Sequence, residues 1–228
     1  MTRRFFELAE RFDAPFDARA RTDLLATIRA FEAMDRHIDA IADAGARREA
    51  FEKLVAYLGG ATCELDPELL RHAEILVGML TGATRAPFVA YLQTFFVHTE
   101  RLRLTTEAAV YERSILEEAR ATAAMTTCIV PCLGHPPWPR VFARLAETAN
   151  LVDKLHDVRA DHRAGEIAIE PGLRLHLRLV GAFLRSALLV LIESPRPLSL
   201  VRWGIPFLGR PQSLFASTSA MNASKPAQ

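Results

Sequence analysis

Aspartates recur at four-residue spacing in two segments of this chain. Each series has members at i, i+4 and i+8, which are Asp35, Asp39 and Asp43 in the first and Asp153, Asp157 and Asp161 in the second. On a helix, positions four apart share a face, with side-chain roots about 6 Å apart. Hard divalent cations, Mg²⁺ above all, bind through one or two carboxylates together with substrate phosphates. Two such helices facing each other would therefore offer a Mg²⁺ site, and we predict all six aspartates as its ligands.

The first series lies in a segment with a helical apolar stripe. A helix over Arg21–Ala44 places five apolar residues on that stripe, namely Leu24, Ile28, Phe31, Ile38 and Ala42. Asp35 falls in the middle of the stripe, Asp39 flanks it and Asp43 lies at its edge. A core-facing carboxylate is costly unless it is paired or binds a metal. A metal would offset that cost, and so would ion pairs with nearby arginines, which are Arg36, Arg47 and Arg48.

For the second series, a solvated acidic face is an equally good interpretation. The helix predicted over Pro139–Ala164 has an apolar stripe roughly opposite its aspartates, formed by Val141, Leu145, Val152 and Leu155. Asn150 lies on the acidic side. Taken alone, this series does not distinguish a surface from a site. Together, the two series favour a shared Mg²⁺ site at the mouth of an apolar cavity between the two helices.

Other metal chemistries lack their residues. The three cysteines, Cys63, Cys128 and Cys132, have no zinc-type spacing, and we expect them to be small buried hydrophobic residues. A ferritin-like di-iron bundle would need Glu-x-x-His on two helices, and no glutamate of the chain has a histidine three residues later. So few cysteines also indicate a reducing compartment. Because the N-terminal residues lack the apolar stretch of a signal peptide, we expect a cytoplasmic protein.

A period of 3.6 residues dominates the sequence, and the alternation typical of strands is nearly absent. We predict an all-α fold, with a single helical bundle over residues 1–208 and a disordered tail from Gly209 to Gln228. Proline, glycine and aspartate mark the helix boundaries. The predicted helices are Thr2–Phe12, Arg21–Ala44, Arg47–Leu58, Pro67–Leu80, Pro87–Leu104, Thr105–Val130, Pro139–Ala164, Pro171–Glu193 and Pro197–Leu208.

The charge balance argues against nucleic acid as a partner. The chain of 228 residues has 28 Lys and Arg against 27 Asp and Glu, a formal net charge of +1. Nucleic-acid-binding proteins instead concentrate basic charge on one face. Hydrophobic residues make up 50% of the chain, enough for a real core. Nothing in the composition specifies an oligomeric state.

The C-terminal region combines apolar residues with arginines. The most apolar segment, Leu173–Ile192, is interrupted on one stripe by Arg174, Arg178 and Arg185. A transmembrane helix needs about 20 mostly apolar residues with few charges, so we predict no membrane span. The segment Leu198–Leu208 carries one Arg and one Trp, a composition suited to a membrane interface. We expect these last helices either to dock on the core or to contact the inner face of a membrane peripherally.

Both acidic segments resemble motifs of one enzyme family. Residues 30–43, Ala-Phe-Glu-Ala-Met-Asp-Arg-His-Ile-Asp-Ala-Ile-Ala-Asp, resemble the first aspartate-rich motif of the squalene/phytoene synthase family, Arg-x-x-Asp-x-x-x-Asp. Residues 157–167, Asp-Val-Arg-Ala-Asp-His-Arg-Ala-Gly-Glu-Ile, resemble the second, an Asp-Val-x-x-Asp followed by Gly, Ile and a nearby Pro, here Pro171. Asp39 and Asp157 lie 118 positions apart, about the family's separation. The resemblance covers roughly Asp23 to Pro171.

This resemblance implies a compact member of the class I isoprenoid synthase fold. It implies that Mg²⁺ held by both aspartate clusters clamps the diphosphate of a prenyl diphosphate and neutralises charge on the leaving diphosphate. The catalytic residues that it implies are Asp39, Asp43, Asp157 and Asp161. Arg36 matches the family position that helps to bind the diphosphate. Condensation or cyclisation would follow ionisation.

Two other functions stay open. The C-terminal region, about Pro171–Leu208, is short for this family, which suggests a catalytically silent, membrane-associated relative that acts as a binding or scaffold protein. Residues 155–158, Leu-His-Asp-Val, resemble the Leu-His-Asp-Ile core of HD-type phosphohydrolases. That family would also need a metal-binding histidine well upstream, and it would leave Asp39 and Asp43 without a role.

Overall fold

The described part of the chain is built from helices. A computed structural model describes residues 17–129, 139–194, 197–198 and 201–202. Within these ranges no strand is formed, which confirms the all-α prediction there. The helices are α2 (Ala18–Asp39), α3 (Ala44–Gly59), α4 (Pro67–Met79), α5 (Gly82–Leu104), α6 (Ala108–Ile129), α7 (Pro139–Ala164) and α8 (Leu173–Glu193).

Most predicted helices lie within a few residues of their observed bounds, and α7 has the predicted bounds. Asp66 caps α4, where its Oδ1 accepts a hydrogen bond from the Glu68 N–H at 2.9 Å, and Pro67 fills the first position. Several predictions fall wholly or partly outside the described residues, among them the helix Thr2–Phe12, most of the helix Pro197–Leu208, Cys132 and the tail from Gly209.

The first acidic helix ends earlier than predicted. α2 ends at Asp39 rather than at Ala44, and Asp43 caps α3 instead. The Oδ1 of Asp43 accepts a hydrogen bond from the Ala46 N–H at 2.7 Å. This cap satisfies a backbone N–H that the start of a helix leaves free, so it favours a break at this point. The i, i+4, i+8 spacing predicted that Asp35, Asp39 and Asp43 share one helix face. That prediction is wrong for Asp43, because it lies outside α2.

α5 begins five residues before its predicted start. The Thr81 N–H donates to Thr84 Oγ1 at 3.0 Å, which starts the helix at Gly82. Pro87 therefore lies inside the helix, where it lacks an N–H for the carbonyl four residues earlier. Further along, Phe88 is fully buried and belongs to the core rather than to a ligand site.

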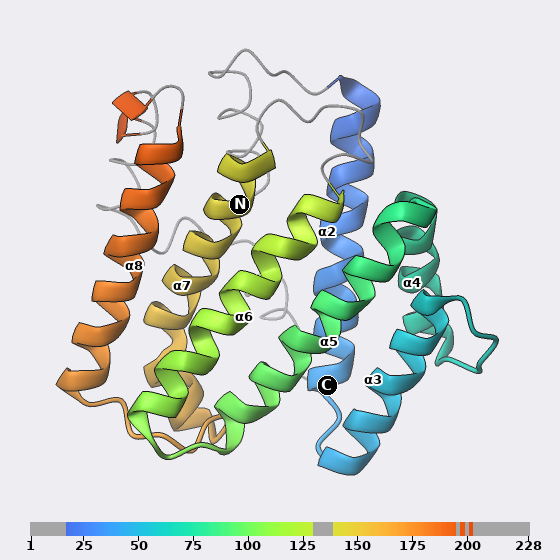
Figure 1. Ribbon diagram of the computed structural model, residues 1–228. Coiled ribbons are helices and arrows are strands. Elements are labelled where there is room, and N and C mark those ends of the chain that lie inside the picture. The colour runs from blue at the N-terminus through green and yellow to red at the C-terminus, as the bar shows by residue number, and fades with distance from the viewer. Residues whose placement is uncertain (1–16, 130–138, 195–196, 199–200, 203–228) are drawn as a thin grey trace, which may run out of the picture.

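The up-and-down course of the helices brings the C-terminal ends of α2 and α7 to one end of the bundle. α5, α6, α7 and α8 pack side by side in chain order, and α2 packs mainly on α4 (Figure 1). α2 and α7 both run downward in this view, so their C-terminal turns lie at the lower end, where α3, α6 and α8 begin (Figure 1). Asp39 and Asp161 stand in those C-terminal turns. The negative end of a helix dipole favours cations at such a position.

The interior contains two large hydrophobic clusters rather than one. The first joins α2, α3, α4, α5 and the end of α6, and its fully buried members are Leu58, Ala73, Leu76 and Phe88. The second joins the end of α5 with α6, α7 and α8, and its largest fully buried side chains are Tyr111, Ile115, Leu151, Val158 and Leu179. The two clusters meet along α5 and α6, and the residues between them are polar, as described below.

α8 is apolar on both sides. Its inner residues belong to the second cluster, yet several large apolar side chains on its outer side are exposed. This helix is long enough and apolar enough to cross a membrane, but core helices of soluble proteins can have the same length and composition. A core helix is mostly buried, whereas only 22% of the most apolar 18-residue stretch of α8 is buried.

A buried ion pair fixes the connection between α2 and α3. The Arg47 Nε and Nη2 donate to the two carboxylate oxygens of Glu100 at 2.8 and 3.0 Å, and its Nη1 donates to the Ile41 carbonyl at 2.9 Å. Arg47 is 8% exposed. A forked guanidinium–carboxylate pair with so little solvent is strongly directional. It ties the loop after α2 to the last turns of α5.

We expect Arg47→Ala to lower the free energy of unfolding by about 2 kcal/mol, because it leaves the half-buried Glu100 carboxylate without its two hydrogen bonds from Arg47. Urea denaturation would measure the loss. The control is Lys53→Ala, which removes an exposed ion pair with Glu49 and should leave stability unchanged. Equal losses in the two variants would contradict a special role for Arg47.

Candidate functional site

A buried carboxylate on α6 lies at the centre of the polar residues between the two clusters. Glu118 is 1% exposed. Its Oε2 accepts a hydrogen bond from Thr99 Oγ1 on α5 at 3.0 Å, and its Oε1 accepts one from Asn150 Nδ2 on α7 at 3.2 Å. The Lys154 Nζ lies 3.3 Å from the same Oε1. Glu118 thus joins three helices through hydrogen bonds and an ion pair.

Lys154 supplies the countercharge for this carboxylate. Burial is the largest single influence and opposes the charged form of the ammonium, but Glu118, Tyr111 and Asp161 together outweigh burial and hold the pKa of Lys154 above its ordinary value. The ammonium therefore stays protonated at neutral pH.

The same ammonium acts on aspartates from both predicted series. Burial, reinforced by Asp39, raises the pKa of Asp35 to about 7, and burial also raises the pKa of Asp39. Burial raises the pKa of Asp153 and of Asp161 to about 6 each. In all four cases the charge of Lys154 opposes the rise. Carboxyl groups from α2 and α7 therefore share one electrostatic environment.

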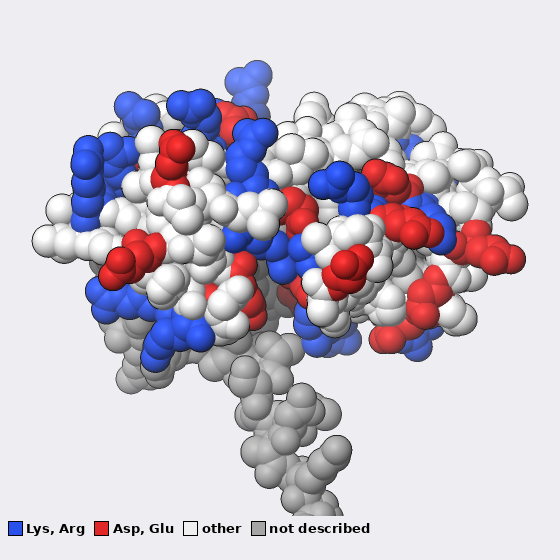
Figure 2. Space-filling view, turned by 90° about the horizontal axis from the view of Figure 1, so that it is seen from below, with Lys and Arg blue, Asp and Glu red and all other residues white. Residues whose placement is uncertain are grey.

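A second set of ion pairs lies at the lower end of the bundle. The Nη2 of Arg103 on α5 lies 2.5 Å from Asp39 Oδ1. Its Nε lies 3.5 Å from the Oε1 of Glu100, which is also the partner of Arg47. Seen from this end, acidic and basic side chains are mixed, and acidic atoms line the crease between the two halves of the bundle (Figure 2). The acidic series of α2 is thus partly neutralised by Arg103 from a third helix.

The structure places Asp35 at the edge of the buried face of α2 rather than in its middle. The buried positions of that helix are Ala20, Leu24, Thr27, Ala30, Met34 and Ile38. Asp35 follows Met34 and is half-buried, whereas Asp39 is exposed. Arg36 is exposed, and its Nε donates to the carbonyl of Glu32 on its own helix at 3.2 Å. Among the described residues, no ion pair joins Arg36 to an aspartate of either series.

The buried stripe of α7 also differs from the predicted one. Its buried residues include Val141, Ala143, Glu147, Leu151 and Val158, whereas Leu145, Val152 and Leu155 are only half-buried. This stripe runs closer to the aspartates than predicted, so the acidic side is not fully solvated. Asp153 and Asp161 are half-buried, and Asp157 is exposed.

Sequence reasoning missed Glu118, Lys154 and Arg103. Lys154 offered a signal, because it lies three residues after Leu151 and four before Val158, on the same helix face. A lysine in such a stripe implies a buried countercharge. Glu118 gave a weaker signal, since its helix is rich in alanine and shows no sharp stripe. Arg103 gave only the local signal of Glu100 three residues earlier, because its shorter contact, with Asp39, comes from a distant helix.

The donor chemistry suits Mg²⁺, although the carboxylates do not converge. Among the described residues, no three His, Cys, Asp or Glu side chains gather closely enough to hold a metal ion. The available donors are carboxylate oxygens, together with the buried Asn150 Oδ1, which has no hydrogen-bond partner. An amide oxygen without a partner, beside Glu118 and Lys154, is an acceptor that a cation or a water could use.

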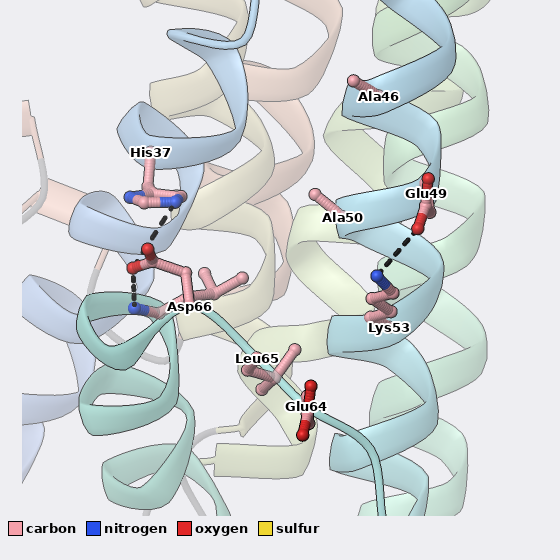
Figure 3. A pocket seen from close by; sticks show the side chains of 9 residues that line it. His37, Ala46, Glu49, Ala50, Lys53, Glu64, Leu65 and Asp66 are labelled. Carbon is pink, nitrogen blue, oxygen red and sulfur yellow. Dashed lines mark hydrogen bonds and ion pairs between the residues drawn. The ribbon is translucent and has the colours of Figure 1, made fainter.

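Two surface hollows formed by described residues lie away from this polar region. One is a shallow depression on α8, lined by Leu173, Arg174, Leu177 and Arg178. The other lies among α2, α3 and α4, where His37 faces Asp66 and Lys53 pairs with Glu49 (Figure 3). Neither of these two is the apolar cavity that the sequence places between α2 and α7.

Comparisons with protein-family profiles, with curated proteins and with solved structures gave no match to this chain.

We expect Asp35→Asn to stabilise the protein in a pH-dependent way. Because the pKa of Asp35 rises from 3.8 to about 7 on folding, the folded state holds a proton that the unfolded chain releases. The stability that this carboxyl contributes at low pH is therefore lost as the pH rises from about 4 to about 7. The asparagine stays neutral, so its free energy of unfolding should exceed that of the wild type above pH 7 by on the order of 1 kcal/mol or more.

Thermal unfolding across this pH range would measure the difference. Asp23→Asn, at a more exposed position on the same helix, is the matched control and should show a small difference that does not grow with pH. If the gap between Asp35→Asn and the wild type stayed constant with pH, a raised pKa at this carboxyl would be wrong.

Proposed function

We propose that this chain is a Mg²⁺-dependent enzyme of the class I isoprenoid type, which ionises a prenyl diphosphate by releasing diphosphate, ahead of condensation or cyclisation. The observation that carries the proposal is the shared electrostatic environment of the two aspartate series. Lys154 acts on Asp35 and Asp39 from α2 and on Asp153 and Asp161 from α7. The resemblance of both segments to the squalene/phytoene synthase motifs supports the same function.

A cluster of carboxylates formed in advance is not required for this chemistry. Mg²⁺ is commonly held by one or two carboxylates, by waters and by the phosphates of the substrate. When bound, the cation would neutralise charge that develops on the leaving diphosphate. The residues that would hold it are Asp35, Asp39 and Asp43 from the first series and Asp153, Asp157 and Asp161 from the second.

In the absence of a ligand, Asp39 and Asp43 already have partners within the protein. Asp39 is paired with Arg103, so its carboxylate must exchange that partner to bind a cation. Asp43 uses Oδ1 as the cap of α3, which leaves Oδ2 for a ligand. The basic groups would then pair with diphosphate oxygens, an interaction that suits guanidinium geometry. Arg103 is the guanidinium that contacts Asp39, and Arg36 is exposed on the last turns of α2.

The same ion pairs favour one alternative, a catalytically silent protein. Lys154 and Arg103 already neutralise part of the acidic charge, and in the part of the chain that is described no metal-binding group is formed. In such a protein the half-buried Lys154 would take the structural place of a cation, and the helical bundle would serve as a binding scaffold. The two functions differ in whether diphosphate is released.

We expect Mg²⁺ and a non-hydrolysable prenyl bisphosphonate together to raise the melting temperature more than either component alone. At a ligand concentration about 100-fold above the dissociation constant, the stabilisation would be about 2.7 kcal/mol, or roughly 5–10 °C for a chain of this size. Asp39→Asn and Asp157→Asn, which change exposed aspartates on different helices, should each abolish the joint shift. Differential scanning fluorimetry would measure it.

The matched control is again Asp23→Asn, which should retain the joint shift because this residue lies toward the other end of α2. A shift that persists in both Asp39→Asn and Asp157→Asn would overturn the metal-diphosphate site. His156→Ala distinguishes the HD-type phosphohydrolase from the proposed enzyme. A hydrolase of that type would lose its activity with His156→Ala and keep it with Asp39→Asn.

We further expect the wild-type protein to release diphosphate from at least one of the C10, C15 and C20 prenyl diphosphates, and only when Mg²⁺ is present. Asp157→Asn should lower the rate at least 100-fold, because it removes charge from the site that the leaving group needs. A coupled assay of released diphosphate would measure the rate. If no substrate released diphosphate while the joint thermal shift was observed, the silent binding protein would be the better interpretation.

A further inference from the structure

We infer that the outer face of α8 is a docking surface for an anionic phospholipid bilayer, on which the helix lies in the plane of the membrane. We call this surface the outer α8 face. Its apolar members are Leu173, Leu177, Val180, Leu184, Leu188 and Ile192. This inference does not depend on the proposed chemistry between α2 and α7.

The outer α8 face is apolar along its whole length. Its five most exposed members, all Leu or Ile, have 56–76% of their surface accessible. Their spacing of three and four residues keeps them on one stripe of the helix. α8 forms the edge of the bundle beside α7, so no other described helix covers this stripe (Figure 1). Contiguous exposed apolar surface of this kind marks an interaction site more often than a free surface.

Arginines follow one edge of this stripe. Arg174 and Arg185 have no ion-pair partner among the described residues, whereas Arg178 is paired with Glu112. The acidic residue within α8 is Glu193, which is bonded to Arg144. A basic edge beside an apolar face suits an anionic membrane surface, because the leucines enter the acyl region while the guanidinium groups reach the phosphates.

The depression near the start of α8 fits the same ligand. Two leucines and two arginines line it, namely Leu173, Leu177, Arg174 and Arg178. Apolar side chains alternate there with guanidinium groups, which match phosphate oxygens in geometry. The short described segments after α8 continue the pattern, because Leu198 and Val201 are exposed and Arg202 is also exposed.

The inner face of α8 argues against a membrane-spanning position. Leu175, Leu179 and Val190 are buried, and the first two pack in the same cluster as Ile115 and Leu151. A spanning helix would leave this cluster and expose it to water, and it would also carry three arginines into the hydrocarbon region. An in-plane position keeps both faces of the helix buried, one in the protein and one in the lipid.

The charge of the face also argues against pairing with a second copy of the chain. Leu173, Leu177, Val180 and Leu184 have the spacing of a coiled-coil seam. Two copies paired through this seam would bring Arg174 and Arg185 of each chain close to the seam, with no acidic residue on the outer α8 face to compensate them. An anionic bilayer supplies that compensation.

Co-sedimentation of the full chain with lipid vesicles tests this inference. We expect binding to vesicles of equal parts phosphatidylcholine and phosphatidylglycerol, and at least tenfold weaker binding to phosphatidylcholine alone. The double variant Leu177→Glu, Leu184→Glu should lose at least tenfold in affinity for the anionic vesicles. The double variant Arg174→Gln, Arg185→Gln should lose roughly tenfold, and raised salt should weaken the wild type in the same direction.

The control is Val97→Glu, which changes an exposed apolar residue of α5 far from α8 along the chain and should bind as the wild type does. Circular dichroism should show that each variant keeps its helical content. Absent binding, or binding that survives Leu177→Glu, Leu184→Glu, would overturn the inference. So would a dimer of the free protein that this variant dissociates, or protein retained on vesicles after an alkaline carbonate wash, which would indicate a membrane span.

Discussion

The ion pair between Lys154 and Glu118 determines how the two halves of this bundle meet. Glu118 is almost completely buried and accepts contacts from α5 and α7, while the ammonium of Lys154 opposes the rise in the pKa of four aspartates from α2 and α7. Without that ammonium, Arg103 would still compensate part of the charge of Asp35 and Asp39, but the carboxyl groups of α7 would lose a main countercharge in a poorly solvated region. The polar region on α5, α6 and α7 is therefore partly neutralised by cations of the protein itself, Lys154 and Arg103.

Local signals in the sequence predicted most of the fold. The apolar period of 3.6 residues identified the helices, and Asp66 with Pro67 marked the start of α4 where the structure has it. The aspartate spacing also identified carboxyl groups from two distant segments that the structure brings into one electrostatic environment. The helix predictions succeeded because caps and periodicity act within a few residues of the chain.

Features that depend on residues distant in the sequence could not be predicted in the same way. The sequence alone extended α2 to Ala44, because the apolar pattern continues past the point where Asp43 caps α3. It also placed the buried stripe of α7 on Val152 and Leu155 rather than on Leu151 and Val158. Which face of a helix is buried depends on its neighbours, and here the neighbour contributes Glu118, a residue with no distinctive motif around it.

The two ion-pair contacts of Glu100 have a mechanical consequence. This one carboxylate lies within ion-pair distance of Arg47, at the start of α3, and of Arg103, which in turn contacts Asp39 at the end of α2. Three helix ends are therefore linked in series, and a displacement of the end of α2 would strain the first turn of α3. Chain length between Asp39 and Arg47 should thus be less free to vary through evolution than chain length in the connection between α3 and α4.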